Sequence, residues 1–378
     1  MNFISNLIGF NRELIKGYVT IDDEGIIGST EKMWLIYSGE RKKDKLPVSL
    51  FVLKKQKLLN RSDNSDQISA MFKKEAQNLV KLRHPSFLPI LEPVHEDQKQ
   101  IVYVTERIES TLQLVLKEKK MSQLNDDLQL KVNLKSIVNG LDFLNNDLQS
   151  VHLNLSPENI FITATGEWKI GGMMFLRTVQ KEDSMGYTKL DPSLSIKPNY
   201  TYTSFSHLEN INLRCDLFSF TIVLYHIFAV LEEKKVILLE RLSSQKEALN
   251  HLEQIVGINK KPFMEVFPIQ LLDLVGKILK RKGSCVGHSD FLENKWFDDI
   301  RLKIIDYFSV FITKTEQEQK DFLCILSRNM EEFKPKLIVN MIIPFLNQHK
   351  TKENIDMFVL SALLLIAEKK LIEPKDIR

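Results

Sequence analysis

The chain has 378 residues, of which 43% are apolar and 27% are charged, and its formal net charge is +3. This length allows two or three domains with a sizeable core, and so small a net charge does not indicate nucleic-acid binding. The three cysteines form no C-x-x-C pair and no metal-ligand spacing with the eight histidines, so we expect a reducing compartment and no metal site.

Residues 1–17 form a separate N-terminal segment without the basic region and continuous apolar core of a secretory signal. A short helix here would place four apolar residues on one face: Phe3, Ile4, Leu7 and Ile8. That face would either dock on the following lobe or contact a membrane surface or a partner.

Residues 18–106 alternate short β-rich runs with turns and predict a small lobe. Residues 33–39 (MWLIYSG) and 47–55 (PVSLFVLKK) are predicted strands joined by a charged loop, and residues 100–106 (QIVYVTE) are a third. Residues 66–82 have the apolar period of a helix.

Residues 107–299 predict a larger helical lobe with a strand-rich insert over 151–178. Within it, residues 214–231 are apolar on nearly every side, which predicts a central buried helix. Residues 300–378 predict a helical tail with helices at 303–312, 316–329, 335–347 and 354–369, the third kinked by Pro344. The longest apolar run, Phe358 to Ala367, falls short of the about 18 residues that cross a bilayer, so the cytoplasm is expected.

The segment HLNLSPEN (152–159) resembles the protein-kinase catalytic loop H-R-D-L-x-x-x-N. WKIGGM (168–173) follows at the spacing of the strand that leads into D-F-G, and LRHPSFLPIL follows a helix that carries Glu75. CDLFSF (215–220) retains Asp216 at the start of the central helix. The resemblance implies a bilobal, α+β protein-kinase fold followed by an all-α tail.

The same comparison of motifs implies that the catalytic groups are missing. The positions that would carry the phosphate-binding lysine, the catalytic aspartate, the loop lysine and the metal-binding aspartate hold Phe51, Asn154, Ser156 and Gly172. The Gly-rich loop is reduced to Gly25 and Gly28. The retained frame consists of Glu75, His152, Asn159 and Asp216, for which we expect structural roles. Because phosphoryl transfer depends on charge neutralisation by metal and lysine, we expect no enzyme activity and no cofactor.

In kinases the glutamate of A-P-E pairs with a buried arginine, and we expect this chain to have lost both charges of that ion pair. Ser206 aligns with the glutamate of A-P-E and Cys285 with its buried arginine. Losing both partners of a buried ion pair is tolerated, whereas losing one costs about 3–5 kcal/mol.

The degenerate pattern resembles the Scyl pseudokinases, which have an N-terminal kinase-like domain followed by HEAT repeats, and most nearly their clathrin-associated branch. The resemblance is carried by VSLFV, LRHPSFL, GEWKIGG, KPNY and KWFDD in this order, followed by the helical tail. It implies a non-catalytic scaffold or adaptor in vesicle-mediated transport that binds coat or adaptor proteins. It also implies at most peripheral association with Golgi or endosomal membranes.

Two alternatives remain open at this point. The chain could be a divergent kinase with residual ATP binding that uses Asn159 with Lys54 or Lys55, or a helical-repeat binding module capped by a degenerate kinase lobe. In the tail, the last helix offers an apolar candidate interface for a protein partner or a second copy. Its residues are Phe358, Leu360, Leu363, Leu364 and Ile366.

Overall fold

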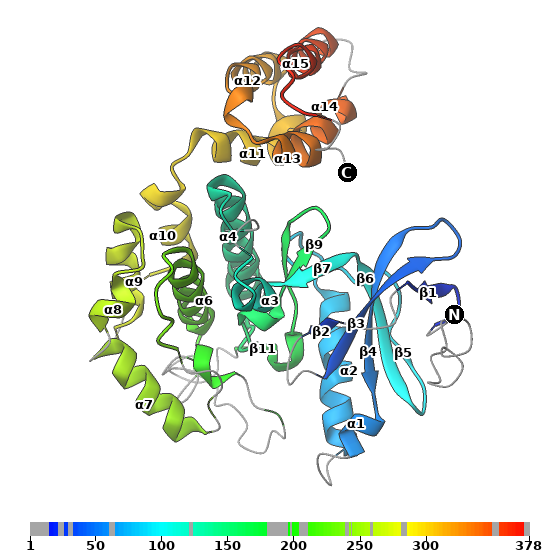
Figure 1. The fold of residues 1–378 in the computed structure, drawn as a ribbon, viewed down its shortest axis with the longest axis vertical. Helices are drawn as coiled ribbons and strands as arrows, with labels where there is room; N and C mark the ends of the chain where they lie inside the picture. The colour runs from blue at the N-terminus through cyan, green and yellow to red at the C-terminus, as the bar shows by residue number, and fades with distance from the viewer. Residues whose placement is uncertain are drawn as a thin grey trace. The chain divides into compact units, whose positions relative to one another are not determined.

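Figure 1 shows the computed structural model of the chain. The structure describes residues 15–21, 26–28, 33–59, 65–120, 124–179, 196, 199–203, 211–238, 242, 244–257, 260–280, 286–349 and 355–373. The chain forms two compact units. The first comprises Met1–Asn125 and Asn133–Leu292, and the second comprises Asp126–Val132 and Glu293–Arg378.

The first unit begins with an antiparallel sheet in the order β1-β3-β4-β6-β5, with β2 paired to β3. Its strands are β1 (Tyr18–Thr20), β2 (Ile26–Gly28), β3 (Trp34–Arg41), β4 (Pro47–Lys54), β5 (His95–Glu96) and β6 (Gln100–Glu106). A short helix α1 (Gln56–Leu59) precedes α2 (Ser65–Lys81), which lies along the sheet in Figure 1.

Alternation along β4 divides the small lobe into two apolar clusters, one on each face of the sheet. Phe51 and Leu53 belong to the inner cluster, which contains Phe72 of α2. Leu50 and Val52 belong to an outer cluster with Tyr18. Because successive side chains of a strand point to opposite faces, both faces of β4 are buried although only one packs on α2.

The rest of the first unit is mainly helical. Its helices are α3 (Leu112–Lys117), α4 (Asp127–Asp142, of which the first residues belong to the second unit), α6 (Cys215–Leu231), α7 (Gln245–Val256), α8 (Lys260–Met264), α9 (Leu272–Ile278) and α10 (His288–Leu292). The strands between α4 and α6 are β8 (Ser150–Val151), β9 (Ile160–Thr163), β10 (Trp168–Ile170) and β11 (Arg177–Thr178). β9 pairs with β10 and with β7 (Ile108–Thr111), and β8 pairs with β11.

The central helix α6 has the burial that its composition predicts. Every residue from Cys215 to Val230 except His226 is buried, including Asp216. A helix surrounded on all sides needs apolar side chains all round. Of the few polar groups that α6 carries, Asp216 binds the backbone of a neighbouring loop.

The second unit contains α11 (Ile300–Val310), α12 (Glu316–Arg328), α13 (Pro335–Leu337), α14 (Ile343–His349) and α15 (Asp356–Glu368). The third expected tail helix is divided, because a π-helical turn over Ile338–Ile342 separates α13 from α14. Pro344 is the second residue of α14 and lacks a backbone N–H, so the irregularity falls just before it. An aromatic core joins the helices, with the rings of Phe311 and Phe345 5.0 Å apart and edge-on.

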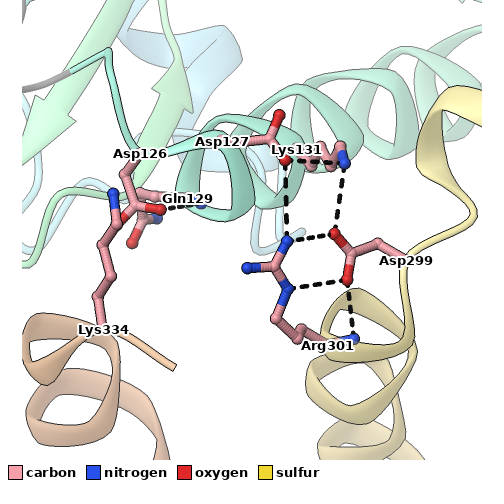
Figure 2. Close-up of polar contacts among 7 residues, drawn as sticks. All are labelled: Asp126, Asp127, Gln129, Lys131, Asp299, Arg301 and Lys334. Atoms are coloured by element: carbon pink, nitrogen blue, oxygen red, sulfur yellow. Dashed lines mark hydrogen bonds and ion pairs between the residues drawn. The ribbon is translucent and has the colours of Figure 1, made fainter. Parts of the chain in front are cut away.

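Figure 2 shows a charge network inside the second unit, at the start of α11. Arg301 donates to both carboxylate oxygens of Asp299, from Nε over 3.0 Å and from Nη2 over 2.7 Å. Asp299 also caps the helix by accepting from the backbone N–H of Arg301. Lys131, in the first turns of α4, lies 3.3 Å from Asp299 and 2.9 Å from Asp127. Residues far apart in sequence therefore build one corner of this unit.

Candidate functional site

Asp216, at the start of α6, binds the backbone of the kinase-like loop. Its carboxylate accepts from the backbone N–H of His152 over 2.8 Å and from that of Leu153 over 3.0 Å. Leu153 has a φ of 60°, a left-handed conformation that is costly for a branched residue. The buried carboxylate stabilises this strained turn.

His152 takes part in the same frame as a neutral side chain. Its Nδ1 accepts from the backbone N–H of Asn154 over 3.0 Å, so Nε2 carries the proton and donates to the carbonyl of Gly171 over 2.8 Å. Complete burial lowers the pKa of His152 below its usual value. These contacts fit the structural role expected from the sequence.

Asn154 and Asn159 use their amide groups to tie the loop to itself. Asn154 Nδ2 donates to the carbonyl of Gly172 over 3.1 Å. Asn159 Nδ2 donates to the carbonyl of Asn154 over 2.8 Å and to Ser156 Oγ over 3.3 Å. The three side chains are buried, and an amide has no useful basicity, so this set can hold the loop but cannot accept a proton from a substrate.

Gly172 is packed directly against Asn159. A Cβ built on Gly172 would overlap Cγ of Asn159 and lie 2.8 Å from its Cβ, and the φ of Gly172 is +70°. A side chain at position 172 would therefore overlap Asn159 where it now lies and would strain the backbone. Because the position opposite Asn159 cannot carry a carboxylate in this arrangement, the residues present do not fit a kinase-type Mg²⁺ site. Within the described ranges, no group of three His, Cys, Asp or Glu could hold a metal ion.

Phe51 lies in an aromatic cluster where a phosphate-binding lysine would be needed. Its ring stacks on Tyr103 at 4.6 Å with an interplanar angle of 14°. It also meets Phe161 edge-on at 5.3 Å and Trp34 at 6.4 Å. All four rings are buried. The residues around position 51 form a packed apolar core and do not fit a nucleotide phosphate, which needs cationic or N–H donors.

Glu75 of α2 has an indole as its partner instead of a lysine. Trp34 Nε1 donates to Glu75 Oε2 over 3.1 Å, and Oε1 has no hydrogen-bond partner within the described part of the chain. Burial raises the pKa of Glu75 to about 7, and the hydrogen bond from Trp34 opposes this only in part. The contact fixes α2 against β3 without an ion pair.

The lysines of the divergent-kinase alternative lie elsewhere. Lys55 Nζ is 2.8 Å from Glu96 of β5, and Lys73 approaches the other oxygen of the same carboxylate at 2.6 Å. Lys54 is exposed at the end of β4. Since Phe51 and Lys55 are on the same side of the strand but far apart along it, Lys55 does not replace a lysine at position 51.

The candidate interface on α15 divides into exposed and buried residues. Leu360 and Leu364 are 45% and 59% exposed, whereas Phe358 and Leu363 are half-buried. Ile366 is only 3% exposed and belongs to the core of the second unit, which corrects its assignment to an interface. Met357, which the apolar pattern of the sequence did not single out, is 68% exposed and extends the exposed stripe by one turn.

Several positions singled out in the sequence lie outside the described residues. They are the N-terminal apolar residues Phe3, Ile4, Leu7 and Ile8, the loop residue Gly25, and the A-P-E positions Ser206 and Cys285.

Trp34, Tyr103 and Phe161 were not predicted as parts of the site. The signal that could have indicated them is the register of the sheet, because Phe51 pairs directly with Tyr103 across β4 and β6 and with Ile36 on β3. An apolar residue at the lysine position then implies apolar neighbours on both adjacent strands.

Comparison with known proteins identifies the class to which this fold and this centre belong. The family model described as protein tyrosine and serine/threonine kinase matches residues 32–264, and the chain belongs to this family. The expected kinase fold is therefore confirmed.

Within that class the relatives include SCY1-like proteins, which confirms the resemblance to the Scyl family. The chain is 25% identical to SCY1-like protein 2 of Homo sapiens over 90% of its own length and 39% of that protein's. It is 25% identical to protein kinase-like protein SCY1 of Saccharomyces cerevisiae over 84% of its length and 44% of the relative's. A protein of Dictyostelium discoideum named probable inactive serine/threonine-protein kinase scy1 is 20% identical over 85% of this chain and 35% of its own length. The chain thus spans less than half the length of these relatives.

Proposed function

We propose that the chain is a catalytically inactive, kinase-like scaffold or adaptor that acts in vesicle-mediated transport through protein–protein interactions. The single observation that carries the loss of catalysis is the contact between Gly172 and Asn159, which leaves no room for a metal-binding side chain at position 172. The aromatic packing of Phe51 supports it independently. Membership of a family with a relative named as probably inactive agrees with this proposal.

The adaptor role rests on the relation to the SCY1-like proteins and on the exposed stripe of α15. We propose vesicle coat or adaptor proteins as partners, which is what the resemblance to the clathrin-associated branch implies, and the cytoplasm with peripheral association at Golgi or endosomal membranes as the location. In the described residues, no helix has both the length and the apolar character required to cross a membrane.

The loss of nucleotide binding is tested by thermal unfolding with increasing Mg²⁺·ATP. A ligand at 100 times its Kd stabilises the native state by about 2.7 kcal/mol, which would raise Tm by several degrees. We expect no saturable rise, and the same flat response from Asn154→Asp. A saturable rise, or phosphotransfer by Asn154→Asp above the unmutated protein, would support the divergent kinase instead.

The partner proposal is tested by affinity purification of the intact chain from a membrane-containing extract, with quantitative mass spectrometry. Enrichment of coat or adaptor components would support it, and their absence from repeated purifications would contradict it. The double variant Leu360→Asp, Leu364→Asp then distinguishes a scaffold that binds through its kinase-like unit from a HEAT-type module that binds through its helical tail. Loss of partners with folding retained would assign the binding to the helical tail, whereas unchanged partners would assign it to the kinase-like unit.

A further inference from the structure

A pocket with a volume of about 610 Å³ lies on the first unit, away from the kinase-like centre. Three chain segments form it: Ile15–Tyr18, Arg41–Lys43 and Glu92–His95. Of its apolar lining residues, Tyr18 and Ile15 pack in the outer apolar cluster, whereas Val94 packs against the inner cluster of α2 and Phe51. None of its residues takes part in the motifs that relate this chain to kinases.

Hydrogen bonds fix the three segments to one another. The hydroxyl of Tyr18 donates to Glu92 Oε1 over 2.6 Å, which joins the start of β1 to the segment before β5. The backbone N–H of Lys42 donates to the carbonyl of Gly17 over 2.8 Å, which joins the β3–β4 turn to the same place. Gly17 has a φ of +93°, a conformation that suits glycine and turns the chain here. The hydrogen bonds that join the three segments therefore do not use the ammonium groups of Lys16 and Lys43.

The charges on its lining are strongly unbalanced. The basic side chains are Lys16, Arg41, Lys42, Lys43 and His95, and the acidic one is Glu92. Glu92 accepts from Tyr18, and Arg41 pairs with Asp44 beside the pocket, from Nε over 2.9 Å and from Nη2 over 2.6 Å. The excess of positive charge on the lining therefore comes from its lysines. Within the described residues, neither Lys16 nor Lys43 has an ion-pair partner. Cations gathered in a concave surface raise the local concentration of anions.

The geometry favours a compact polyanion over an extended acidic peptide. The neighbouring edge strands β1 and β5 have three and two residues, too few for a peptide to add as a further strand. Lysine ammonium groups act as point charges that bind phosphate, and the volume lies in the range of small-ligand pockets. We propose that this pocket binds a multiply phosphorylated small group, either a soluble polyphosphate or the phosphorylated headgroup of a lipid. This inference is independent of the proposed adaptor function.

The test uses the full chain and inositol hexakisphosphate as the soluble probe, with binding measured by calorimetry. The pocket variant is Lys16→Gln with Lys43→Gln, which removes two exposed charges and adds none. The matched control is Lys74→Gln with Lys81→Gln, which removes two exposed charges from α2 that do not line the pocket. We expect binding to weaken about tenfold in the pocket variant, which corresponds to about 1.4 kcal/mol, and to stay within about twofold in the control.

A parallel arm uses phosphatidylcholine vesicles with and without phosphatidylinositol 4-phosphate. Binding to the phosphorylated vesicles that depends on Lys16 and Lys43 would assign the pocket to a lipid headgroup. Binding of the soluble probe alone would assign it to a soluble polyphosphate. Equal binding by both double variants, no binding by the unmutated chain, or equal competition by a polyglutamate peptide would overturn the proposal. If the pocket variant does not fold, Lys43→Gln alone is measured against Lys74→Gln by the same criteria.

Discussion

Replacement of Glu75 by glutamine should change how the stability of the first unit depends on pH. Glu75 is fully buried, accepts one hydrogen bond from Trp34 and has a pKa raised to about 7 from its usual 4.5. Below pH 4.5 the carboxyl is protonated in both the folded and the unfolded chain, so its contribution to stability is fully present there. As the pH rises through 7 that contribution is lost, because the native state must either keep a proton that the unfolded chain has released or ionise a buried group.

The size of the effect follows from the difference between the two pKa values. At about 1.4 kcal/mol for each pKa unit, the difference between 4.5 and about 7 corresponds to about 3 kcal/mol. Most of it, roughly 2–3 kcal/mol, should be lost between pH 5 and pH 8. Glu75→Gln has no carboxyl to titrate, so the stability of the variant relative to the unmutated chain should rise by that amount over this interval.

The measurement is urea unfolding at pH 5, 6, 7 and 8, followed by tryptophan fluorescence. A Trp296→Phe background removes the signal of the second unit and leaves that of the first. At each pH the free energy of unfolding of Glu75→Gln is compared with that of the unmutated chain, so that contributions from the histidines, which are common to both, cancel. Glu118→Gln, at an exposed carboxylate, is the control and should show a constant difference. A constant difference for Glu75→Gln as well, within about 0.5 kcal/mol, would refute the idea that this carboxyl is buried without a cation.

Gly172→Asp should lower the free energy of unfolding by at least about 2 kcal/mol, because its Cβ overlaps Asn159 and its φ is positive; Asn159→Ala in the same chain should recover part of the loss in urea unfolding. Leu364→Glu should leave thermal unfolding nearly unchanged, whereas Ile366→Glu should abolish folding of the second unit, and equal effects would show that α15 presents another face. Asp299→Asn should cost about 2 kcal/mol at pH 7, since the guanidinium of its bidentate partner holds the Asp299 pKa well below its usual range. This stabilisation is present above the unfolded pKa and is lost as pH falls through the folded one, so unfolding curves of Asp299→Asn and the unmutated chain should converge at acidic pH.

The sequence located most elements because their patterns are local. The strands expected at 33–39, 47–55 and 100–106 correspond to β3, β4 and β6, and the helix expected at 66–82 corresponds to α2. Motif spacing likewise identified the catalytic-loop frame, and the Asp216 contacts follow from it.

The missed features depend on neighbours distant in sequence. Trp34 and Glu75 are 41 residues apart, and nothing in either local pattern marks an indole as the partner of that carboxyl. The selection of Ile366 for an interface failed for another reason. α15 is apolar on most sides, so its period could not indicate which residues face the core, and only packing in the second unit places Ile366 inside.

The charge network of Figure 2 has a consequence for the order in which the protein is made. Lys131 and Asp299 are 168 residues apart, so at about 5–20 residues per second the ribosome makes the second partner roughly 10–30 s after the first. During that delay the first turns of α4 can be helical, but Lys131 has no contact with Asp299. Closing a loop of this length costs about 4–5 kcal/mol of chain entropy, which favours late assembly of this corner. While the rest of the first unit, up to Leu292, is being made, residues 126–132 of a nascent chain should therefore lack their contacts with α11.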